Sequence, residues 1–193
     1  MKLVFATHNL NKFKEVQSLL PDTIKLVSLT DIGCHDDIPE TAATIEGNAL
    51  LKVKYIKDNY ALDCFADDTG LEVRALDKAP GVYSARYAGP DANAESNINK
   101  LLDNMRDMQD RSARFKTVIA LSFKGEDILF EGICKGAIIS QKRGDKGFGY
   151  DPIFLPDGKN QTFAEMSIKE KNTIGHRGKA IQKLITHFLQ IKP

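Results

Sequence analysis

Apolar runs and amphipathic stretches alternate in the first part of the chain. Leu3–Ala6 is continuously apolar and then turns polar, which predicts a strand buried on both faces. From Asn11 to Leu20 apolar side chains recur at helical spacing, and Pro21 ends the pattern. A second strand is predicted over Ile24–Leu29. The order strand, loop, helix places backbone N–H groups and a positive dipole end at the helix start, where a phosphate group can bind.

The same two patterns continue along the rest of the chain and are interrupted by Gly and Pro. The segment Thr30–Thr44 has no clear periodicity and is expected to be an acidic loop. The other predicted elements are a helix over Ile45–Ala61, a helix over Ala94–Met105 with Asp91 as its N-cap, a hairpin of strands Arg114–Phe123 and Ile128–Ile139, an edge strand over Pro152–Pro156 and a last helix over Gly178–Gln190. The first of these helices carries several lysines, and we expect most of them to be solvated.

Two adjacent carboxylates, Asp67 and Asp68, follow the apolar residues Phe65 and Ala66. Two like charges at the end of a buried strand repel each other and must be desolvated, so a cation, a metal ion or a charged substrate is expected beside them. A solvated turn that closes a hairpin is the alternative, because Asp, Thr and Gly all favour turns. The acidic loop, which contains Glu40, favours a metal-assisted phosphate site over that turn.

Composition narrows the choice of partners and compartment. The 193 residues are 42% hydrophobic and 27% charged, as expected for one ordinary domain, here two-lobed and spanning residues 1–193. The net charge is only +1, so no global field attracts nucleic acid or a membrane. Three widely spaced cysteines indicate neither a disulfide framework nor a zinc site. The N-terminus has too few apolar residues for a signal peptide, and cytoplasmic localisation is expected.

Two features near the C-terminus suggest ligand contacts. The segment Gly144–Asp151 contains three glycines, and it offers Phe148 and Tyr150 as candidate stacking faces. A flexible hairpin loop is the alternative. His176 and Arg177 stand at the start of the last predicted helix, where cations are unfavourable unless an anion or an acceptor-rich ligand lies beside them.

Taken together, the motifs of this chain resemble those of the inosine/xanthosine triphosphate pyrophosphatase family. The matching segments are, in order, Ala6–Lys12, Glu40–Thr41, Ala66–Leu71, Pro80–Gly89, Gly147–Pro152 and His176–Gly178. The resemblance implies hydrolysis of ITP, dITP and XTP to the monophosphate and pyrophosphate, with Mg²⁺, by a cytoplasmic homodimer. It also implies two α/β lobes around a long mixed β-sheet, with the active site in the cleft between them.

The resemblance also assigns roles by matching position. Phosphate binding falls to Thr7, His8, Asn9, Leu10, Asn11 and Lys12. Glu40 and Asp68 would hold Mg²⁺, and Asp68 would also orient or deprotonate the attacking water. The nucleoside would be held by Phe148, Gly149, Tyr150, Asp151, Lys171, His176 and Arg177, while Lys52 and Thr69 complete the nucleotide-binding set. His8 replaces a frequent Gly and Thr69 a frequent Ser, while Gly175 precedes His176 where Ser is frequent.

The residues fit this chemistry independently of the resemblance. Water attack on a phosphoryl group needs positioning and charge neutralisation, and carboxylate-bound Mg²⁺, Lys12 and a helix N-terminus supply both. The P-loop motif Gly-x-x-x-x-Gly-Lys-Ser/Thr does not occur in the sequence. A pyrophosphatase for pyrimidine or modified nucleotides stays open, as does a non-catalytic nucleotide-sensing or RNA-binding module, although the latter has no use for the carboxylates.

Selectivity is expected to depend on Arg177. A guanidinium group is only a hydrogen-bond donor, so it matches the oxygen at purine position 6 of hypoxanthine and xanthine. Adenine carries an amino donor at that position, and an unmet buried polar group costs about 1–3 kcal/mol. The sequence hypothesis is therefore that Arg177 favours ITP over ATP.

Overall fold

A computed structural model describes residues 1–91 and 93–190. The chain divides into two compact units. Unit 1 contains Met1–Asp68, Thr117–Gly132 and the segment that starts at Arg177, and unit 2 contains Thr69–Lys116 and Ile133–His176. The predicted single two-lobed domain includes residues 92 and 191–193, which lie outside the described residues, and it stays a prediction, as does the cleft between lobes.

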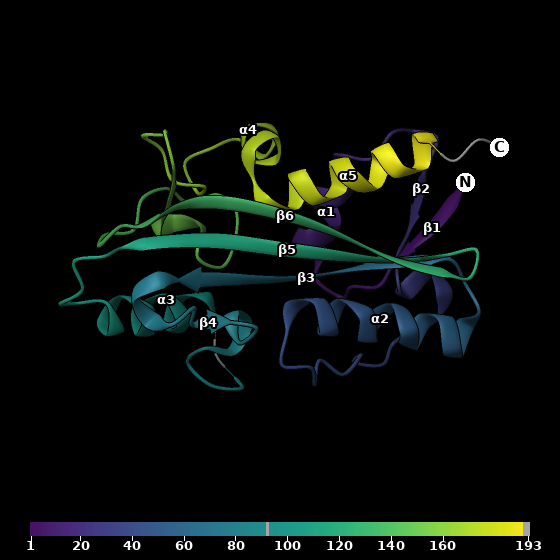
Figure 1. The fold of residues 1–193 in the computed structure, drawn as a ribbon, viewed down its shortest axis with the longest axis horizontal. Coiled ribbons are helices and arrows are strands. Elements are labelled where there is room, and N and C mark those ends of the chain that lie inside the picture. The colour runs from purple at the N-terminus through teal and green to yellow at the C-terminus, as the bar shows by residue number, and fades with distance from the viewer. Residues whose placement is uncertain (92, 191–193) are drawn as a thin grey trace. The chain divides into compact units, whose positions relative to one another are not determined.

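The described residues form a mixed α/β structure, which confirms the predicted fold class. The sheet has the strand order β2-β1-β3-β5-β6-β7, with β4 paired to β3 (Figure 1). Its strands are β1 Lys2–Phe5, β2 Lys25–Val27, β3 Cys64–Val73, β4 Pro80–Gly81, β5 Ser112–Phe123, β6 Glu126–Ile138 and β7 Phe154–Pro156. The helices are α1 Leu10–Gln17, α2 Ile45–Tyr60, α3 Ala94–Asn104, α4 Ile168–Ile174 and α5 His176–Gln190.

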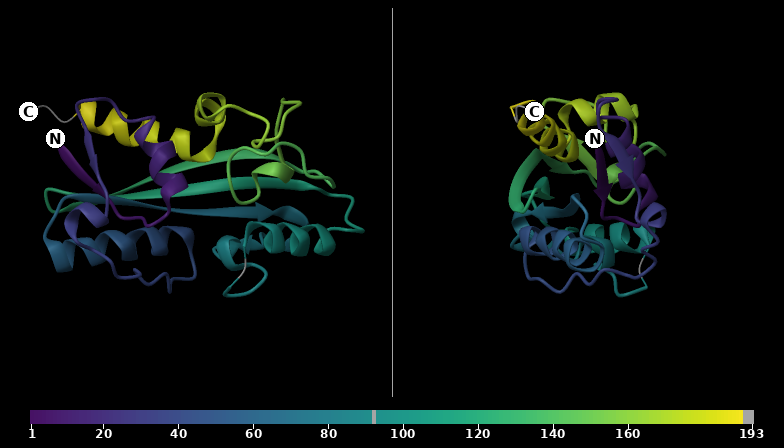
Figure 2. Two further views of the ribbon diagram at one scale, coloured as in Figure 1. Left: turned by 180° about the vertical axis from the view of Figure 1, so that it is seen from behind. Right: turned by 90° about the vertical axis from the view of Figure 1, so that its right-hand side faces the viewer.

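In unit 1, helices cover both faces of a parallel arrangement of strands. Strand β1 pairs in parallel with β2 and with β3, and Phe5 stands opposite Phe65 with the two rings stacked 4.6 Å apart. Helix α5 lies on one face of the strands and α2 on the other, in the front view and from behind (Figures 1 and 2). Val16 of α1 and Leu184 of α5 join these rings in one buried cluster. The continuously apolar pattern of β1 is explained by this two-sided burial.

Unit 2 has a separate hydrophobic core. Strands β3 and β4 pair antiparallel in this unit, and so do β6 and β7. Phe115 of β5 meets Phe154 of β7 edge to face at 4.7 Å, and Phe163 packs against both rings. Leu101 of α3 belongs to the same cluster. Strand β7 ends the strand order, as the prolines of the predicted edge strand suggested.

The strand expected to end at Asp67 and Asp68 continues instead without a break from Cys64 to Val73, so the alternative of a turn at the two carboxylates is excluded. From the sequence, two like charges at this position were expected to need a cation, a metal ion or a charged substrate beside them. Inside unit 1, the side chains of Lys12 and Arg177 bring positive charge to Asp67, so the strand can continue.

The N-cap of α3 and the presence of α4 also differ from the sequence prediction. The N-cap of α3 is Asn93 rather than Asp91, and its side chain accepts a hydrogen bond from the Ser96 N–H. Helix α4 was not predicted, since its residues are mostly polar and give no apolar periodicity. It begins at a capping box in which Ser167 and Glu170 satisfy each other's backbone N–H groups.

The cysteines and the helices bear on two expectations from the sequence, which concern disulfides and membrane spans. The cysteines at positions 34, 64 and 134 are buried and free. Within residues 1–91 and 93–190, no helix combines the length and the apolar composition needed to cross a bilayer.

Candidate active site

The loop between β1 and α1 is held by its own polar side chains. Asn9 is the N-cap of α1, and its Oδ1 accepts hydrogen bonds from the N–H groups of Asn11 and Lys12 at 3.0 and 3.1 Å. The Thr7 hydroxyl accepts from the Asn9 N–H at 3.2 Å. Several backbone donors of this loop are therefore already used inside it. The positive charge of Lys12, rather than those amides, is the strongest attraction that the loop offers to a phosphate.

Asp67 is the buried centre of a charge network in unit 1. Its side chain is fully buried, with Oδ1 at 3.1 Å from Lys12 Nζ and Oδ2 accepting from Arg177 Nε at 3.0 Å. Arg177 also pairs through Nη1 with Glu15 of α1, which is itself buried. Burial alone would raise the pKa of Asp67, but the charges of Lys12, Arg177 and Lys52 hold it well below its usual range. Asp67 is therefore a permanent anion that fixes two cations.

Asp68 lies in a different environment from its neighbour. Its Oδ1 is 3.6 Å from Lys52 Nζ, and Asn48 donates to its Oδ2 at 3.3 Å. Lys52 also pairs directly with Glu40 and donates to the Asp67 carbonyl oxygen at 2.9 Å. Burial raises the pKa of Asp68 above its ordinary value and outweighs the attraction of the nearby lysines. The two adjacent carboxylates thus differ in basicity, and Asp68 is the one better suited to accept a proton.

The geometry brings together the two residues predicted to hold Mg²⁺. Glu40 and Asp68 are both within reach of the single Lys52 ammonium group, although one comes from the acidic loop and the other from β3. The described residues contain no group of three or more His, Cys, Asp or Glu side chains that could hold a metal ion. Mg²⁺ commonly uses one or two carboxylates and takes its remaining oxygen ligands from water and substrate phosphates. The donor set therefore fits Mg²⁺ accompanied by a nucleotide.

The acidic loop is fastened to the rest of unit 1 near its middle. The His8 ring lies 2.9 Å, Nε2 to O, from the Asp36 carbonyl, and the Tyr55 hydroxyl donates to Asp36 Oδ2 at 2.8 Å. These contacts join the loop to the β1–α1 connection and to α2. Glu40 is four residues further along the same loop, so His8 helps to position the segment that carries it.

A second cluster of predicted site residues lies in unit 2. Lys171 of α4 is buried, pairs with Asp151 at 2.6 Å and places its Nζ 4.8 Å from the centre of the Phe148 ring. The Phe148 N–H donates to Asp151 Oδ2 at 2.9 Å. Gly147 is required beside them because its φ is 74° and an added Cβ would lie 2.1 Å from that same oxygen. Asp151 thus holds both the Lys171 ammonium and the backbone of Phe148.

The remaining predicted site residues have mixed surroundings. Tyr150 is buried, and its hydroxyl donates to the Ser84 carbonyl oxygen at 2.9 Å, which is a structural contact. His176 is buried and stacks on Phe115 at 4.5 Å. Gly149 has a φ of 61° and open space at its Cβ position. Leu10, Asn11 and His8 are exposed, while Thr7 and Thr69 are half-buried.

Arg177 is placed differently from what its proposed role in base recognition suggests. The sequence required an acceptor beside it, and Asp67 and Glu15 supply two such acceptors from the protein itself. Its predicted contact with the purine 6-oxygen stays a prediction.

Glu15 and Asn48 were missed in the sequence. Glu15 had a signal, because it lies four residues before Leu19 and so shares the predicted buried face of α1. An acidic residue on that face indicates a buried cationic partner, here Arg177. Asn48 had no comparable signal.

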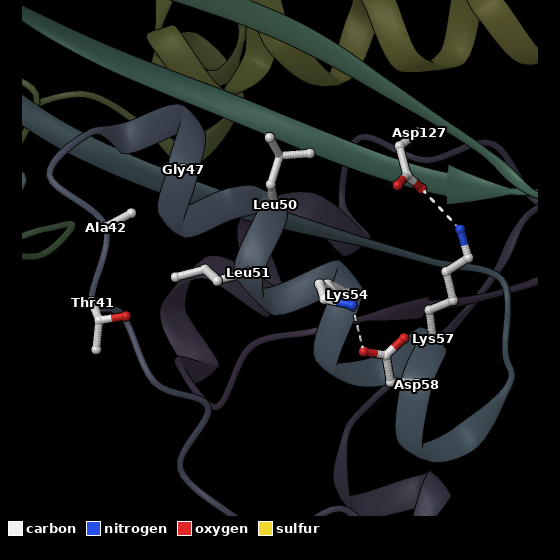
Figure 3. A pocket seen from close by; sticks show the side chains of 9 residues that line it. All are labelled: Thr41, Ala42, Gly47, Leu50, Leu51, Lys54, Lys57, Asp58 and Asp127. Atoms are coloured by element: carbon white, nitrogen blue, oxygen red, sulfur yellow. Dashed lines mark hydrogen bonds and ion pairs between the residues drawn. The ribbon is translucent and has the colours of Figure 1, made fainter.

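A pocket in unit 1 is lined by residues of α2 together with Thr41, Ala42 and Asp127. Its volume is about 710 Å³, and none of the predicted site residues lines it. Figure 3 shows its lysines turned toward carboxylates: Lys54 pairs with Asp58 at 2.8 Å and Lys57 with Asp127 at 3.6 Å.

Comparison with known proteins gives consistent matches over nearly the whole chain. A family model described as the Ham1 family matches residues 3–187. The chain is 59% identical over 188 residues to a dITP/XTP pyrophosphatase of Christiangramia forsetii, covering 97% of this chain and 99% of the relative. It is 51% identical over 192 residues to a dITP/XTP pyrophosphatase of Porphyromonas gingivalis, covering 99% of both. Among solved structures, a HAM1 protein from Coxiella burnetii has a TM-score of 0.91 at 39% identity, with 98% of this chain and 99% of that chain covered.

Proposed function

Because the chain belongs to the Ham1 family, we propose that it hydrolyses dITP and XTP to the nucleoside monophosphate and pyrophosphate. The observation that carries this proposal is the pair of adjacent carboxylates in β3, one fixed as an anion by Lys12 and Arg177 and the other kept more basic by burial. The pair therefore provides a fixed negative charge, Asp67, beside a proton acceptor, Asp68.

Each residue near Asp68 has a task in cleaving the bond between the α- and β-phosphates. Lys12 and Lys52 place two positive charges near Asp68. These charges reduce the electrostatic repulsion between the phosphate oxygens of the substrate and the carboxylates of the site. Asp68 orients the attacking water and accepts its proton, and Asn48 holds the other carboxylate oxygen in place. We propose that Glu40 and Asp68 bind Mg²⁺, which when bound supplies Lewis-acid neutralisation of the phosphoryl oxygens.

We assign recognition of the nucleoside to the cluster of Phe148, Asp151 and Lys171. An aromatic ring offers a stacking face for a purine, and the Lys171 ammonium is only a donor, like Arg177. Either group is suited to an oxygen acceptor at purine position 6. Asp151 supports this arrangement because it holds Lys171 and the Phe148 backbone with one carboxylate.

One assay tests the activity. Purified protein with Mg²⁺ is given dITP, ITP, XTP, GTP, ATP and dTTP separately, and pyrophosphate and orthophosphate are measured independently. Pyrophosphate should be released from dITP, ITP and XTP, with much less from the others. Release of orthophosphate alone would contradict the proposal, and preferential turnover of dTTP would favour a pyrimidine nucleotide pyrophosphatase. Full activity in excess EDTA would remove Mg²⁺ from the mechanism.

We also propose that the protein works as a homodimer in the cytoplasm. Its buried free cysteines suit a reducing compartment, and the homodimer follows from the family resemblance. Light scattering coupled to size-exclusion chromatography tests the assembly, where a monomer mass at micromolar concentration would contradict it. Cell fractionation tests the compartment.

A further inference from the structure

We propose that Lys52 is a built-in counter-cation that occupies the metal position of the nucleotide-free protein, so that a divalent ion enters only together with the nucleotide. The inference rests on the proposed assignment of Glu40 and Asp68 as Mg²⁺ ligands and goes beyond it. It gives Lys52 a role in the order of binding, in addition to the phosphate contact expected from its position.

The contacts of Lys52 place its ammonium group where a shared metal ion would need to be. It pairs directly with Glu40, lies 3.6 Å from Asp68 Oδ1 and is anchored by a 2.9 Å hydrogen bond to the Asp67 carbonyl oxygen. Only 8% of its side chain and 9% of that of Asp68 are exposed. Water therefore screens the contact between Lys52 and Asp68 weakly, whereas Glu40, with 33% of its side chain exposed, is partly screened. The ammonium itself is a buried part of the site rather than a mobile surface charge.

Charge counting shows why a metal ion alone would be disfavoured. Lys52 pairs with both Glu40 and Asp68 and so already neutralises one of their two negative charges. A divalent ion added here would meet one remaining negative charge and a fixed ammonium close by. Repulsion between two buried cations opposes that state.

A triphosphate changes this balance because it brings its own negative charges. The ammonium can then exchange the carboxylates for phosphate oxygens, and the metal ion can take the carboxylates. Lysine suits such an exchange better than arginine, since it is a compact charge on a flexible stem rather than a rigid bidentate fork. The protein then discriminates against the free metal and in favour of the metal–nucleotide complex.

The test measures binding of Mn²⁺ to nucleotide-free protein by the electron paramagnetic resonance signal of the free ion. Lys52→Met should bind Mn²⁺ at least tenfold more tightly than the wild type. Lys54→Met is the matched control: it removes the same charge from the same helix, at an exposed pair with Asp58, and should leave the affinity unchanged. Lys52→Arg keeps the charge and should bind as weakly as the wild type.

A second variant covers the case in which Lys52→Met does not fold. Lys52→Gln also removes the charge but can still donate to the Asp67 carbonyl oxygen, and it should show the same gain in Mn²⁺ affinity. Equal or weaker Mn²⁺ binding by the folded charge-removing variant would overturn the inference. As a separate control, hydrolysis of dITP by the wild type with Mg²⁺ is measured on the same preparation. If the wild type hydrolyses dITP, unchanged or weaker Mn²⁺ binding by the variant overturns only the inference about Lys52. If the wild type does not hydrolyse dITP, the proposed function is overturned.

Discussion

At the scale of single residues, the site assigns different work to two chemically identical neighbours. Asp67 is fully buried and held by Lys12 and Arg177, so it cannot easily take up a proton. The pKa of Asp68 is raised, its carboxylate accepts a hydrogen bond from the Asn48 amide, and the Lys52 ammonium lies further away. Asp68 is therefore the better base. Their distinct partners, rather than their sequence positions, make Asp68 the more basic of the two.

Replacement of Asp68 by Asn should abolish turnover without unfolding the protein. The carboxamide keeps the shape of the side chain but can neither accept a proton nor bind Mg²⁺ as a charge, and general base catalysis alone typically contributes about 10²–10⁴-fold. The measurement is kcat for dITP, with the thermal unfolding midpoint as the control for folding. A folded Asp68→Asn protein with near-normal kcat would remove Asp68 from the mechanism.

Replacement of Asp67 by Asn should instead destabilise the protein. Removing one partner of a buried ion pair typically costs about 3–5 kcal/mol, because a buried charge is left without its counter-ion. The pKa of Asp67 is depressed in the folded state, so its contribution to stability is present above the unfolded-state pKa of about 3.9 and is lost as the pH falls below it. Urea unfolding should therefore show a large gap between wild type and variant at pH 7 and a narrowing gap below about pH 4. A gap independent of pH would contradict this account.

Single site residues were predictable where a charged residue stood at a position that is unfavourable for a charge. The acidic pair and the cationic His176 and Arg177 stood out because burial or a helix dipole opposes them. The partner of Arg177 could not be named, since the contact with Glu15 joins positions 162 residues apart. Local patterns carry no information about such distant pairings.

At the scale of elements, the start of α1 combines a helix cap with the proposed phosphate-binding loop. Asn9 satisfies two backbone N–H groups of the helix, so the loop is rigid before any ligand arrives. The sequence predicted this element well because a strand, a polar turn and an amphipathic helix follow each other closely. It failed for β3, whose charged residues look like a turn until the cations of α1 and α5 are placed beside them.

Asn9 variants separate the capping role from the electrostatic one. Asn9→Ala should lower the free energy of unfolding by about 1 kcal/mol through loss of the N-cap. Asn9→Asp keeps a good N-cap and should retain stability, but its negative charge faces the proposed phosphate site and should raise KM for dITP at least tenfold. Chemical denaturation and steady-state kinetics measure the two effects. An unchanged KM for Asn9→Asp would show that this loop does not bind phosphate.

At the scale of the whole molecule, the described residues form two units with separate hydrophobic cores. Lys12, Lys52, Glu40 and Asp68 belong to unit 1, whereas Phe148, Asp151 and Lys171 belong to unit 2. The α/β class was predictable from hydrophobic periodicity and from the resemblance. The division into units was not, because strands β3, β5 and β6 each contribute residues to both and no linker marks a boundary in the sequence.

This division predicts two kinetic classes of variant. Lys12→Met in unit 1 should lower kcat/KM for ITP and for ATP by similar factors, because both substrates carry the same triphosphate. Lys171→Met in unit 2 should lower kcat/KM for ITP by about tenfold or more relative to ATP, since it removes a donor suited to the purine 6-oxygen. The ITP/ATP ratio is the measurement. A ratio unchanged by Lys171→Met would move base selectivity back to Arg177.

The order of the segments in unit 1 also bears on how the chain folds while it is being made. Unit 2 is complete once His176 has been synthesised, but unit 1 still lacks Arg177 and the rest of α5 at that moment. Arg177, one of the two cations that pair with Asp67, is therefore synthesised 110 residues after it. Ribosome-stalled chains that end before Arg177 should be readily cut by protease in unit 1, and release of the finished chain should remove that sensitivity. Quality control at the ribosome would then meet a protein in which unit 1, with the proposed phosphate-binding residues, is the last part to become native.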